Sequence, residues 1–548
     1  MKKYILIIIV FGLVQIYSNK TFSQTLGGGE VHGSFQADAQ YYNQDTTIGA
    51  DKIPEAIAVN AFMEMRYTNK NFEAGMRYEL FMPQMQGYDS RWKGNGFGYR
   101  YLRYKNERVD VTAGNFYEQF GSGMILRSYQ EWNLGFDNSL DGVRVKYKMK
   151  ALTITGLVAK QRYYWDVGPG LIRGVDGQLS FNDLFDKMAD SKTRLFFGYS
   201  FVSRYQSDLD PIYKLPENVA AEAARMELFR GRFHYKLEVG WKINDPNASN
   251  NMIYKGGNAV ITELGYSQKG FGFTLQAERV DNMDFRSNRA STGFDLPVGY
   301  IPAMTRQHAY SLAAMYPYAS QANSQMGLQA TLIYKIKKKS TLGGKYGTNI
   351  NINYSIANSI YKEKVNDTIA IDQPGTLGYE SNFFKVGDDL YFTDFNIKIQ
   401  RKLSRKWNVS LMYMNVFYNM FINEGHAEPN VHANIFIGDF WWKFKPYNSL
   451  HLELQALATK QDEGNWTSAM LEYNNRGFFA AVIMLFNQGE AGQSNSSVYP
   501  FITTGYTRKA TRISVSYGKQ REGIVCVGGV CRAVPASNGF ALSINSSF

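Results

Sequence analysis

The chain has 548 residues, a formal net charge of +12 and a mean hydropathy of −0.34. Aromatic residues make up 15% of it, which is high for a soluble protein and typical of a wall that faces lipid between two interfaces. Beyond the N-terminus no stretch offers the about 20 continuous apolar residues of a transmembrane helix, and no Pro/Ser-rich linker or charge block marks a domain boundary.

The N-terminus has the pattern of a secretory signal peptide. A basic start is followed by the apolar run 4–14 and then by small residues before Gln24. This pattern predicts a signal peptide over residues 1–23, cleaved between Ser23 and Gln24. The alternative is a buried helix or a single membrane anchor, for which the apolar run is short. Cleavage would remove three lysines and no acid, which lowers the charge from +12 to +9.

Residues 59–68 and 72–82 alternate with a period of two. Met63 and Met65 share one face of the first run, and Glu64 and Arg66 share the other. Only a strand holds such an alternation, because successive Cβ atoms point to opposite faces. In a membrane barrel the apolar face is turned to lipid and the charged face lines the lumen.

The register of this hairpin follows from its turn. A two-residue turn at 70–71 pairs Met65 with Met76 and places Glu64 opposite Arg77 as a charge pair in the lumen. A slip by one residue would move both charges into lipid, so we expect the register to be strongly specified.

Similar runs continue to the C-terminus, with a weaker one near 172–182. They predict an all-β fold: a single antiparallel transmembrane β-barrel over residues 24–548, with about 24 strands in a range of about 20 to 26. Short connections alternate with long ones, and we expect short periplasmic turns and long extracellular loops. The long connections are expected near 43–55, 116–138, 163–171, 283–325, 359–388, 421–430 and 522–537.

The predicted inner face carries charges of both signs. They either form rungs that hold the wall together or line a water-filled pore, which an excess of basic residues would bias toward anions. These residues are Glu64, Arg66, Glu73, Arg77, Glu79, Arg144, Lys146, Glu238, Glu263, Glu278, Lys398 and Glu453.

The longest predicted loop is too apolar to be freely solvated. Its segment 310–319 reads Tyr-Ser-Leu-Ala-Ala-Met-Tyr-Pro-Tyr-Ala, and we expect it to fold into the barrel mouth or to dock a partner. The first strand begins near Val31, which leaves no room between the cleavage site and the barrel for a separate plug domain.

The sequence offers little catalytic chemistry. His426 and His432 lie near each other in a loop, but loops collect such residues by chance, and we predict no metal site and no cofactor. Gly121-Ser122-Gly123 lacks the flanking spacing of a hydrolase nucleophile, and no base can be named for it. These observations indicate a protein that is not an enzyme and does not bind nucleic acid.

Cys526 and Cys531 are the two cysteines of the chain. They are separated by Val-Gly-Gly-Val, and the glycines permit a turn tight enough for the sulfurs to meet, which predicts a disulfide in the final external loop. The alternative is a metal or redox pair, but no His or other Cys lies nearby in the sequence to complete a tetrahedral site.

The C-terminal run places Phe540, Leu542, Ile544 and Phe548 on one face. With its terminal aromatic it resembles the C-terminal signal by which barrel-assembly machinery recognises its clients. Together with the hairpin repeats, the cysteine clip and the segment Gly-Asn-Phe-Tyr-Glu-Gln-Phe-Gly-Ser-Gly at 114–123, it resembles a family of large, uncharacterised porin-like outer-membrane barrels. The resemblance implies a location and an architecture, and no established substrate.

Two functions follow as hypotheses. The first is a porin-like outer-membrane channel or transporter without a separate plug domain, since a wall of this size leaves an interior that is aqueous or plugged. The alternative is a non-transporting structural subunit of an outer-membrane machine for secretion, assembly or surface display. The expected partners are outer-membrane lipid and lipopolysaccharide, the barrel-assembly machinery during biogenesis, and other outer-membrane proteins.

Overall fold

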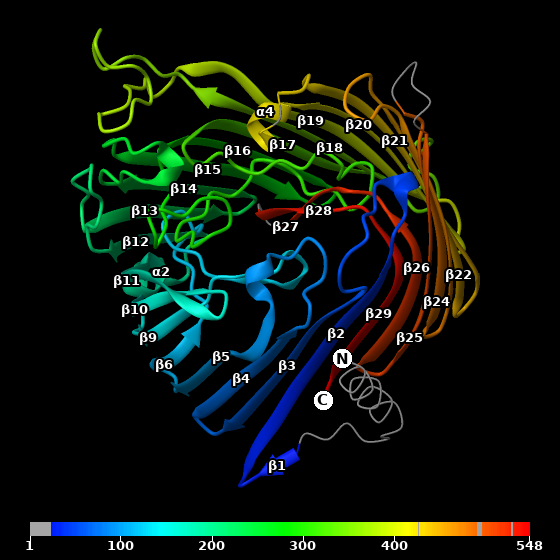
Figure 1. The fold of residues 1–548 in the computed structure, drawn as a ribbon, viewed down its shortest axis with the longest axis horizontal. Coiled ribbons are helices and arrows are strands. Elements are labelled where there is room, and N and C mark those ends of the chain that lie inside the picture. Colours follow the sequence, from blue (N-terminus) through cyan, green and yellow to red (C-terminus); the bar gives the residue numbers. More distant parts are fainter. Residues whose placement is uncertain (1–23, 426, 490–495, 528–529) are drawn as a thin grey trace.

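A closed ring of antiparallel strands forms the molecule (Figure 1). The computed structural model describes residues 24–425, 427–489, 496–527 and 530–548. Its main sheet has 25 strands, of which the short β1 (Gln24–Leu26) pairs only with the start of β2, so 24 strands form the ring. The ring closes where the last strand, β29 (Ser537–Ser547), pairs on one side with β26 and on the other with β2. The predicted all-β single barrel of about 24 strands is therefore confirmed.

The ring strands follow one another in chain order, and each pairs with its predecessor. Besides β29 they are β2 (Gly29–Asn43), β3 (Ile57–Asn69), β4 (Phe72–Phe81), β5 (Gly94–Lys105), β6 (Val109–Phe116), β9 (Leu140–Lys148), β10 (Leu152–Tyr163), β11 (Asp166–Ser180), β12 (Thr193–Tyr205), β13 (Asn218–Arg230), β14 (Phe233–Lys242), β15 (Gly257–Gln268), β16 (Phe271–Asp281), β17 (Ser324–Ile336), β18 (Thr348–Ile360), β19 (Val386–Lys402), β20 (Trp407–Tyr418), β21 (Val431–Lys445), β22 (Asn448–Ala458), β23 (Trp466–Asn475), β24 (Phe478–Asn487), β25 (Ser497–Arg508) and β26 (Thr511–Gln520).

The remaining elements are short and lie in the connections. None of the helices in the described part of the chain is long and apolar enough to cross a membrane. These elements are the strands β7 (Gln130–Glu131), β8 (Phe136–Asp137), β27 (Gly523–Val527) and β28 (Val530–Val534), the helices α2 (Phe181–Leu184), α3 (Asp186–Ala189) and α4 (Met420–Glu424), and the 3-10 helices η1 (Thr46–Ile48), η2 (Ser90–Trp92), η3 (Trp132–Leu134) and η4 (Ala248–Asn250).

Side-chain exposure alternates along the strands as the sequence pattern requires. On β4, Phe72 is 64% exposed and Met76 47%, whereas Arg77 and Glu79 are 1% exposed on the inner face. The β3–β4 pair has the register derived from its turn, with Met65 opposite Met76 and Glu64 opposite Arg77. A slip by one residue in this register would move the charges to the apolar outer surface. The turn that fixes the register is tight, with Lys70 at φ 52°.

The two ends of the barrel differ. At one end most connections are short, such as residues 231–232 between β13 and β14, and at the other end most are long. One predicted long loop is wrong: residues 163–171 belong to a tight hairpin, since β10 ends at Tyr163 and β11 begins at Asp166. The glycines and the proline of 166–171 suggest a loop, but this segment pairs with β10 up to Tyr163 as an extension of the wall.

Candidate functional site

The longest loop lies inside the barrel. Residues 282–323 between β16 and β17, called here the inserted segment, pack first against the arc of wall from β9 to β16 through Met283, Phe285, Val298 and Ile301. They then pack against the arc from β18 to β25 through Leu312, Ala313, Met315, Tyr316 and Tyr318. The apolar stretch 310–319 therefore folds into the barrel rather than into solvent.

The inner wall is apolar where the inserted segment covers it. On β20, Met412, Met414 and Val416 are at most 7% exposed. In a simple pore such inner positions would be polar, because they would face water. Apolar residues on both faces of a strand mean that protein, not water, covers the lumen side here.

A buried charge network ties a second loop to the wall. Arg162 on β10 donates to Glu79 at 2.6 Å and to Asp137 at 2.8 Å, and Arg77 on β4 bonds to the same two carboxylates. Asp137 belongs to β8, in the loop hairpin between β6 and β9. Burial alone would raise the pKa of Asp137, but Arg162 and Arg77 hold it below its ordinary value. The two arginines and the two carboxylates neutralise one another, and such pairing offsets the free-energy cost of burying charged groups.

The predicted lumen pair Glu64 and Arg77 is the outer part of this network. The closest nitrogen and oxygen of the pair are 3.6 Å apart, and the Glu64 side chain is 50% exposed. Both residues line an interior cavity of about 540 Å³ near the barrel seam, together with Arg66, Tyr99 and Tyr101. This cavity is polar and carries both signs of charge, so it suits water and polar solutes.

Loops at the other end are joined to one another around a cavity of about 480 Å³. Arg91 in η2 donates to Asp295 of the inserted segment at 2.7 Å. Arg127 lies between the rings of Tyr129 and Tyr300, 4.3 Å and 4.0 Å from their centroids. Three loops are thereby held together, and the inserted segment is part of this packing.

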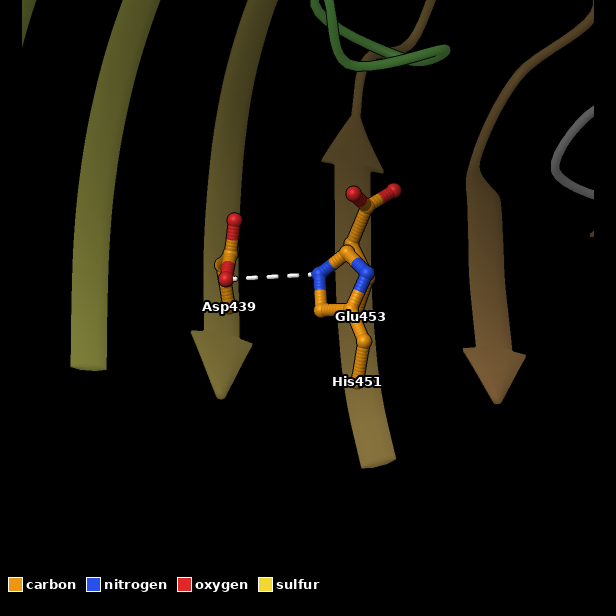
Figure 2. A group of neighbouring side chains, drawn as sticks. All are labelled: Asp439, His451 and Glu453. Carbon is orange, nitrogen blue, oxygen red and sulfur yellow. Dashed lines mark ion pairs between the residues drawn. The ribbon is translucent and has the colours of Figure 1, made fainter. Parts of the chain in front are cut away.

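Three side chains of the types that can bind a metal ion gather on the inner wall (Figure 2). Asp439 on β21 is directly opposite Glu453 on β22, and His451 lies two residues before Glu453 on the same face. One ligand atom from each lies within 4.8 Å of the others. Tyr310 of the inserted segment donates to Asp439 Oδ2 at 2.9 Å, so the segment rests on this group.

The residues predicted from sequence are found in separate places. Cys526 and Cys531 are directly opposite each other in the β27–β28 hairpin, although their side chains fall outside the described part, and the disulfide stays a prediction. Ser23 and the cleavage signal lie outside the described residues, and Gln24 begins β1.

The C-terminal residues complete the ring. Phe548 and Gly33 exchange two backbone hydrogen bonds of 2.9 Å, which extends the β2–β29 ladder to the end of the chain. Phe540 is 54% exposed and packs on Tyr517, whereas Ile544 is 4% exposed. Leu542 lies opposite Ala39 in the same ladder. The role of these residues as an assembly signal stays a prediction.

Sequence reasoning missed the Asp439–His451–Glu453 group. It singled out His426, which lies outside the described residues, and His432, whose exposed ring packs edge-on against Phe417. The three grouped residues span positions 439–453 and form no contiguous motif. A signal existed in the spacing of His451 and Glu453, because residues two apart on a strand share a face.

The chain resembles solved β-barrel structures weakly. The siderophore receptor PirA from Pseudomonas aeruginosa is 10% identical with a TM-score of 0.38, and the match covers 94% of this chain and 80% of that chain. The outer membrane protein opdK from Pseudomonas aeruginosa is 7% identical with a TM-score of 0.35, covering 95% and 98%. OccAB4 from Acinetobacter baumannii is 11% identical with a TM-score of 0.36, covering 79% and 98%.

No curated protein matches the sequence. A family model does, over residues 1–548, and its description is a family of unknown function, DUF6029. By this full-length match, the chain belongs to the family of unknown function DUF6029.

Proposed function

We propose that this chain is an outer-membrane β-barrel that acts as a porin-like channel or transporter, without enzymatic activity and without a separate plug domain. The observation that carries the proposal is the inserted segment, which packs on two separate arcs of the inner wall. A wall of 24 strands encloses a lumen that is either aqueous or plugged. A segment of the chain's own loops in that position is suited to restrict and to gate passage.

The outer surface supports a place in the membrane. Side chains that point outward from the wall are apolar and exposed, including Leu102 at 67%, Phe436 at 53% and Leu411 at 51%. Lipid would cover these side chains, whereas water would not favour so many of them. The predicted signal peptide, residues 1–23, would carry the chain across the inner membrane, with the barrel-assembly machinery and lipopolysaccharide as its expected partners.

The charge of the chain favours anions as the conducted solutes. The mature chain would keep a formal charge of +9 after loss of the three signal-peptide lysines from +12. In the polar interior cavity exposed Arg66 lies beside half-exposed Glu64, so the basic excess is a property of the whole chain and not of this cavity. A lumen in which basic residues outnumber acidic ones attracts anions and repels cations.

Ion conductance in a planar bilayer tests the proposal. Wild-type protein is expected to be silent or to conduct in brief steps, whereas replacing residues 303–321 by a short Gly-Ser linker should give steady steps. The matched control replaces residues 364–371, a loop segment outside both apolar clusters that hold the inserted segment. Reversal potential in a salt gradient then reports the preference for anions.

Two outcomes contradict the proposal. A linker variant that is folded and inserted but remains silent means that the inserted segment does not control a path. Steady wild-type steps equal to those of the variant mean that the segment leaves the lumen open.

A second candidate is a subunit of an outer-membrane complex, which exposed apolar side chains on the loops favour. Leu209 is 90% exposed, Phe384 85% and Ile212 81%, and all three lie between strands at the long-loop end. Exposed apolar side chains mark a contact surface where they gather, and Leu209 and Ile212 lie three residues apart in one connection. Co-purification of a fixed partner by the wild type, lost in a Leu209→Ser/Ile212→Ser variant, would support this candidate, and a solitary barrel in both would reject it.

A further inference from the structure

We infer that Asp439, His451 and Glu453 bind a divalent transition-metal ion on the inner wall of the barrel, with Zn²⁺ as the best fit. The inference does not depend on whether the lumen conducts. It depends on the placement of the three side chains (Figure 2), on two of their buried atoms that make no hydrogen bond, and on the groups that orient them.

The backbone brings the ligands together. Asp439 and Glu453 are direct cross-strand partners, and His451 is the next residue of β22 on the same face. Cross-strand neighbours have Cβ atoms only about 4.5–5.5 Å apart, so three such side chains converge without any strain in the chain. Rigid strands hold such a site better than a loop does.

Two ligand atoms, Asp439 Oδ1 and His451 Nε2, are buried and make no hydrogen bond in the described part of the chain; their residues are 9% and 8% exposed. The contact between them is an ion pair with each other, drawn as a dashed line in Figure 2. Buried polar atoms without a hydrogen bond cost free energy. The two atoms lie 3.3 Å apart, which is the edge of a tetrahedron with metal–ligand distances of about 2.0–2.1 Å. A metal ion between them would satisfy both atoms at once.

A further residue contacts each of the three side chains and fixes its orientation, as is usual for metal ligands. The Tyr310 hydroxyl donates a hydrogen bond to Asp439 Oδ2 at 2.9 Å, so that Oδ1, beside His451, can bind a metal ion. Gln455 donates to Glu453 Oε1 at 2.6 Å, which leaves the second oxygen. The His451 ring stacks on Trp441, with centroids 3.9 Å apart and planes at 12°.

The donor atoms of the three side chains indicate which metal ion the site would bind. One imidazole nitrogen and two carboxylates suit zinc and its neighbours, whereas Ca²⁺ and Mg²⁺ prefer oxygen ligands alone. Lys398 donates to the Tyr310 hydroxyl at 2.8 Å, and Tyr310 binds Oδ2 of Asp439, so this cation lies on the Oδ2 side of the carboxylate. Water from the lumen would supply the fourth ligand.

The His234–Glu263 pair provides a matched control. It lies on the β14–β15 wall with a nitrogen–oxygen distance of 2.7 Å, so it is also a histidine beside a carboxylate. Among the described residues, the one group of three His, Cys, Asp or Glu side chains close enough to hold a metal ion is that of Asp439. The His234–Glu263 pair therefore has no third ligand of these types in the described part of the chain. A histidine–carboxylate pair alone should therefore bind zinc only weakly.

Calorimetric titration of the EDTA-treated, folded barrel with ZnCl₂ tests the inference. We expect one equivalent to bind in the wild type and in His234→Gln, and an affinity at least about 10-fold lower in His451→Gln and Glu453→Gln. Tyr310→Phe, which removes a supporting contact, should lower affinity by about 10-fold or more. CaCl₂ should not compete.

Absence of saturable zinc binding overturns the inference, as does wild-type affinity in His451→Gln or an equal loss in His234→Gln. Folding of each variant is checked by its heat-dependent electrophoretic mobility. Should the variants fail to fold, X-ray absorption of the zinc-loaded wild type decides: one imidazole with oxygen ligands supports the site. Sulfur ligands would place the metal on the cysteine pair and overturn it.

Discussion

Glu64 and Arg77 are direct cross-strand partners, yet the guanidinium of Arg77 lies closer to the acids of the buried network than to Glu64. Arg77 Nε donates to Glu79 at 2.7 Å, while the nearest Glu64 oxygen is 3.6 Å from Nη1. The Glu79 side chain is 1% exposed and that of Glu64 is 50% exposed. The strand register places Glu64 opposite Arg77. The contact of Arg77 with Glu79 is the more stabilising one, because Glu79 is buried and Glu64 is half-exposed.

Glu79→Gln should therefore destabilise the barrel far more than Glu64→Gln. Removing one member of a buried ion pair leaves uncompensated charge and costs about 3–5 kcal/mol, whereas a half-exposed pair contributes about 0–1 kcal/mol. The free energy of unfolding in urea from detergent micelles measures both. Equal losses in the two variants would contradict the assigned roles.

The ion pairs of Asp137 should persist in mild acid. Arginine partners hold the pKa of this carboxyl below its ordinary value, so its stabilising contribution is complete above the unfolded value of about 3.9. That contribution is lost only as pH falls below about 4, through the lower folded pKa. The difference in unfolding free energy between wild type and Asp137→Asn should be constant from pH 8 to 5 and shrink below 4. A difference that shrinks between pH 7 and 5 would show that the arginines do not hold the carboxyl ionised.

Leu312→Ala should loosen the inserted segment. Leu312 is fully buried between the segment and the β18–β25 wall, and shortening such a side chain costs about 2–5 kcal/mol. We expect more frequent open events in bilayer recordings than for the wild type. Leu209→Ala, at a position 90% exposed, is the control and should leave the recordings unchanged. Wild-type gating in Leu312→Ala would show that this contact does not hold the segment.

The cysteine hairpin should be oxidised in the exported protein. Directly opposed residues in an antiparallel pair have Cα atoms about 4.5–5.5 Å apart, within the range that a disulfide needs. Alkylation without reductant should label neither Cys526 nor Cys531, as measured by mass spectrometry. Cys526→Ser should spare barrel assembly, because the loop that the disulfide closes is short and its stabilisation small. Loss of the variant from the outer membrane would assign the hairpin a larger role.

Deletion of Phe548 should slow assembly of the barrel. The residue makes two hydrogen bonds to Gly33 across the seam where the first and last ring strands meet, and the deletion removes both. We expect less folded protein in the outer-membrane fraction at equal expression. Phe548→Tyr keeps the aromatic ring and the backbone and should restore wild-type amounts. Normal assembly of the deletion variant would show that the terminal residue carries no signal.

The strands, their two faces and the class of fold follow from the amino-acid sequence. Period-two alternation is a local consequence of strand geometry, so the run at 72–82 could be assigned to β4 and its apolar face to the outside without tertiary information. The β3–β4 register followed as well, because a two-residue turn and one apolar face leave a single alignment.

What fills the lumen, and where Asp439, His451 and Glu453 meet, became clear only from the folded barrel. The apolar character of 310–319 predicted burial, but only the folded barrel shows that the segment packs against the wall from β18 to β25. Asp439 lies opposite Glu453 only because the β21–β22 ladder shifts by one residue between Lys443 and Lys445. A regular hairpin counted from its turn would pair Asp439 with an outward-facing residue. Strand alternation alone does not reveal this one-residue shift, which is why the group became apparent only in the folded barrel.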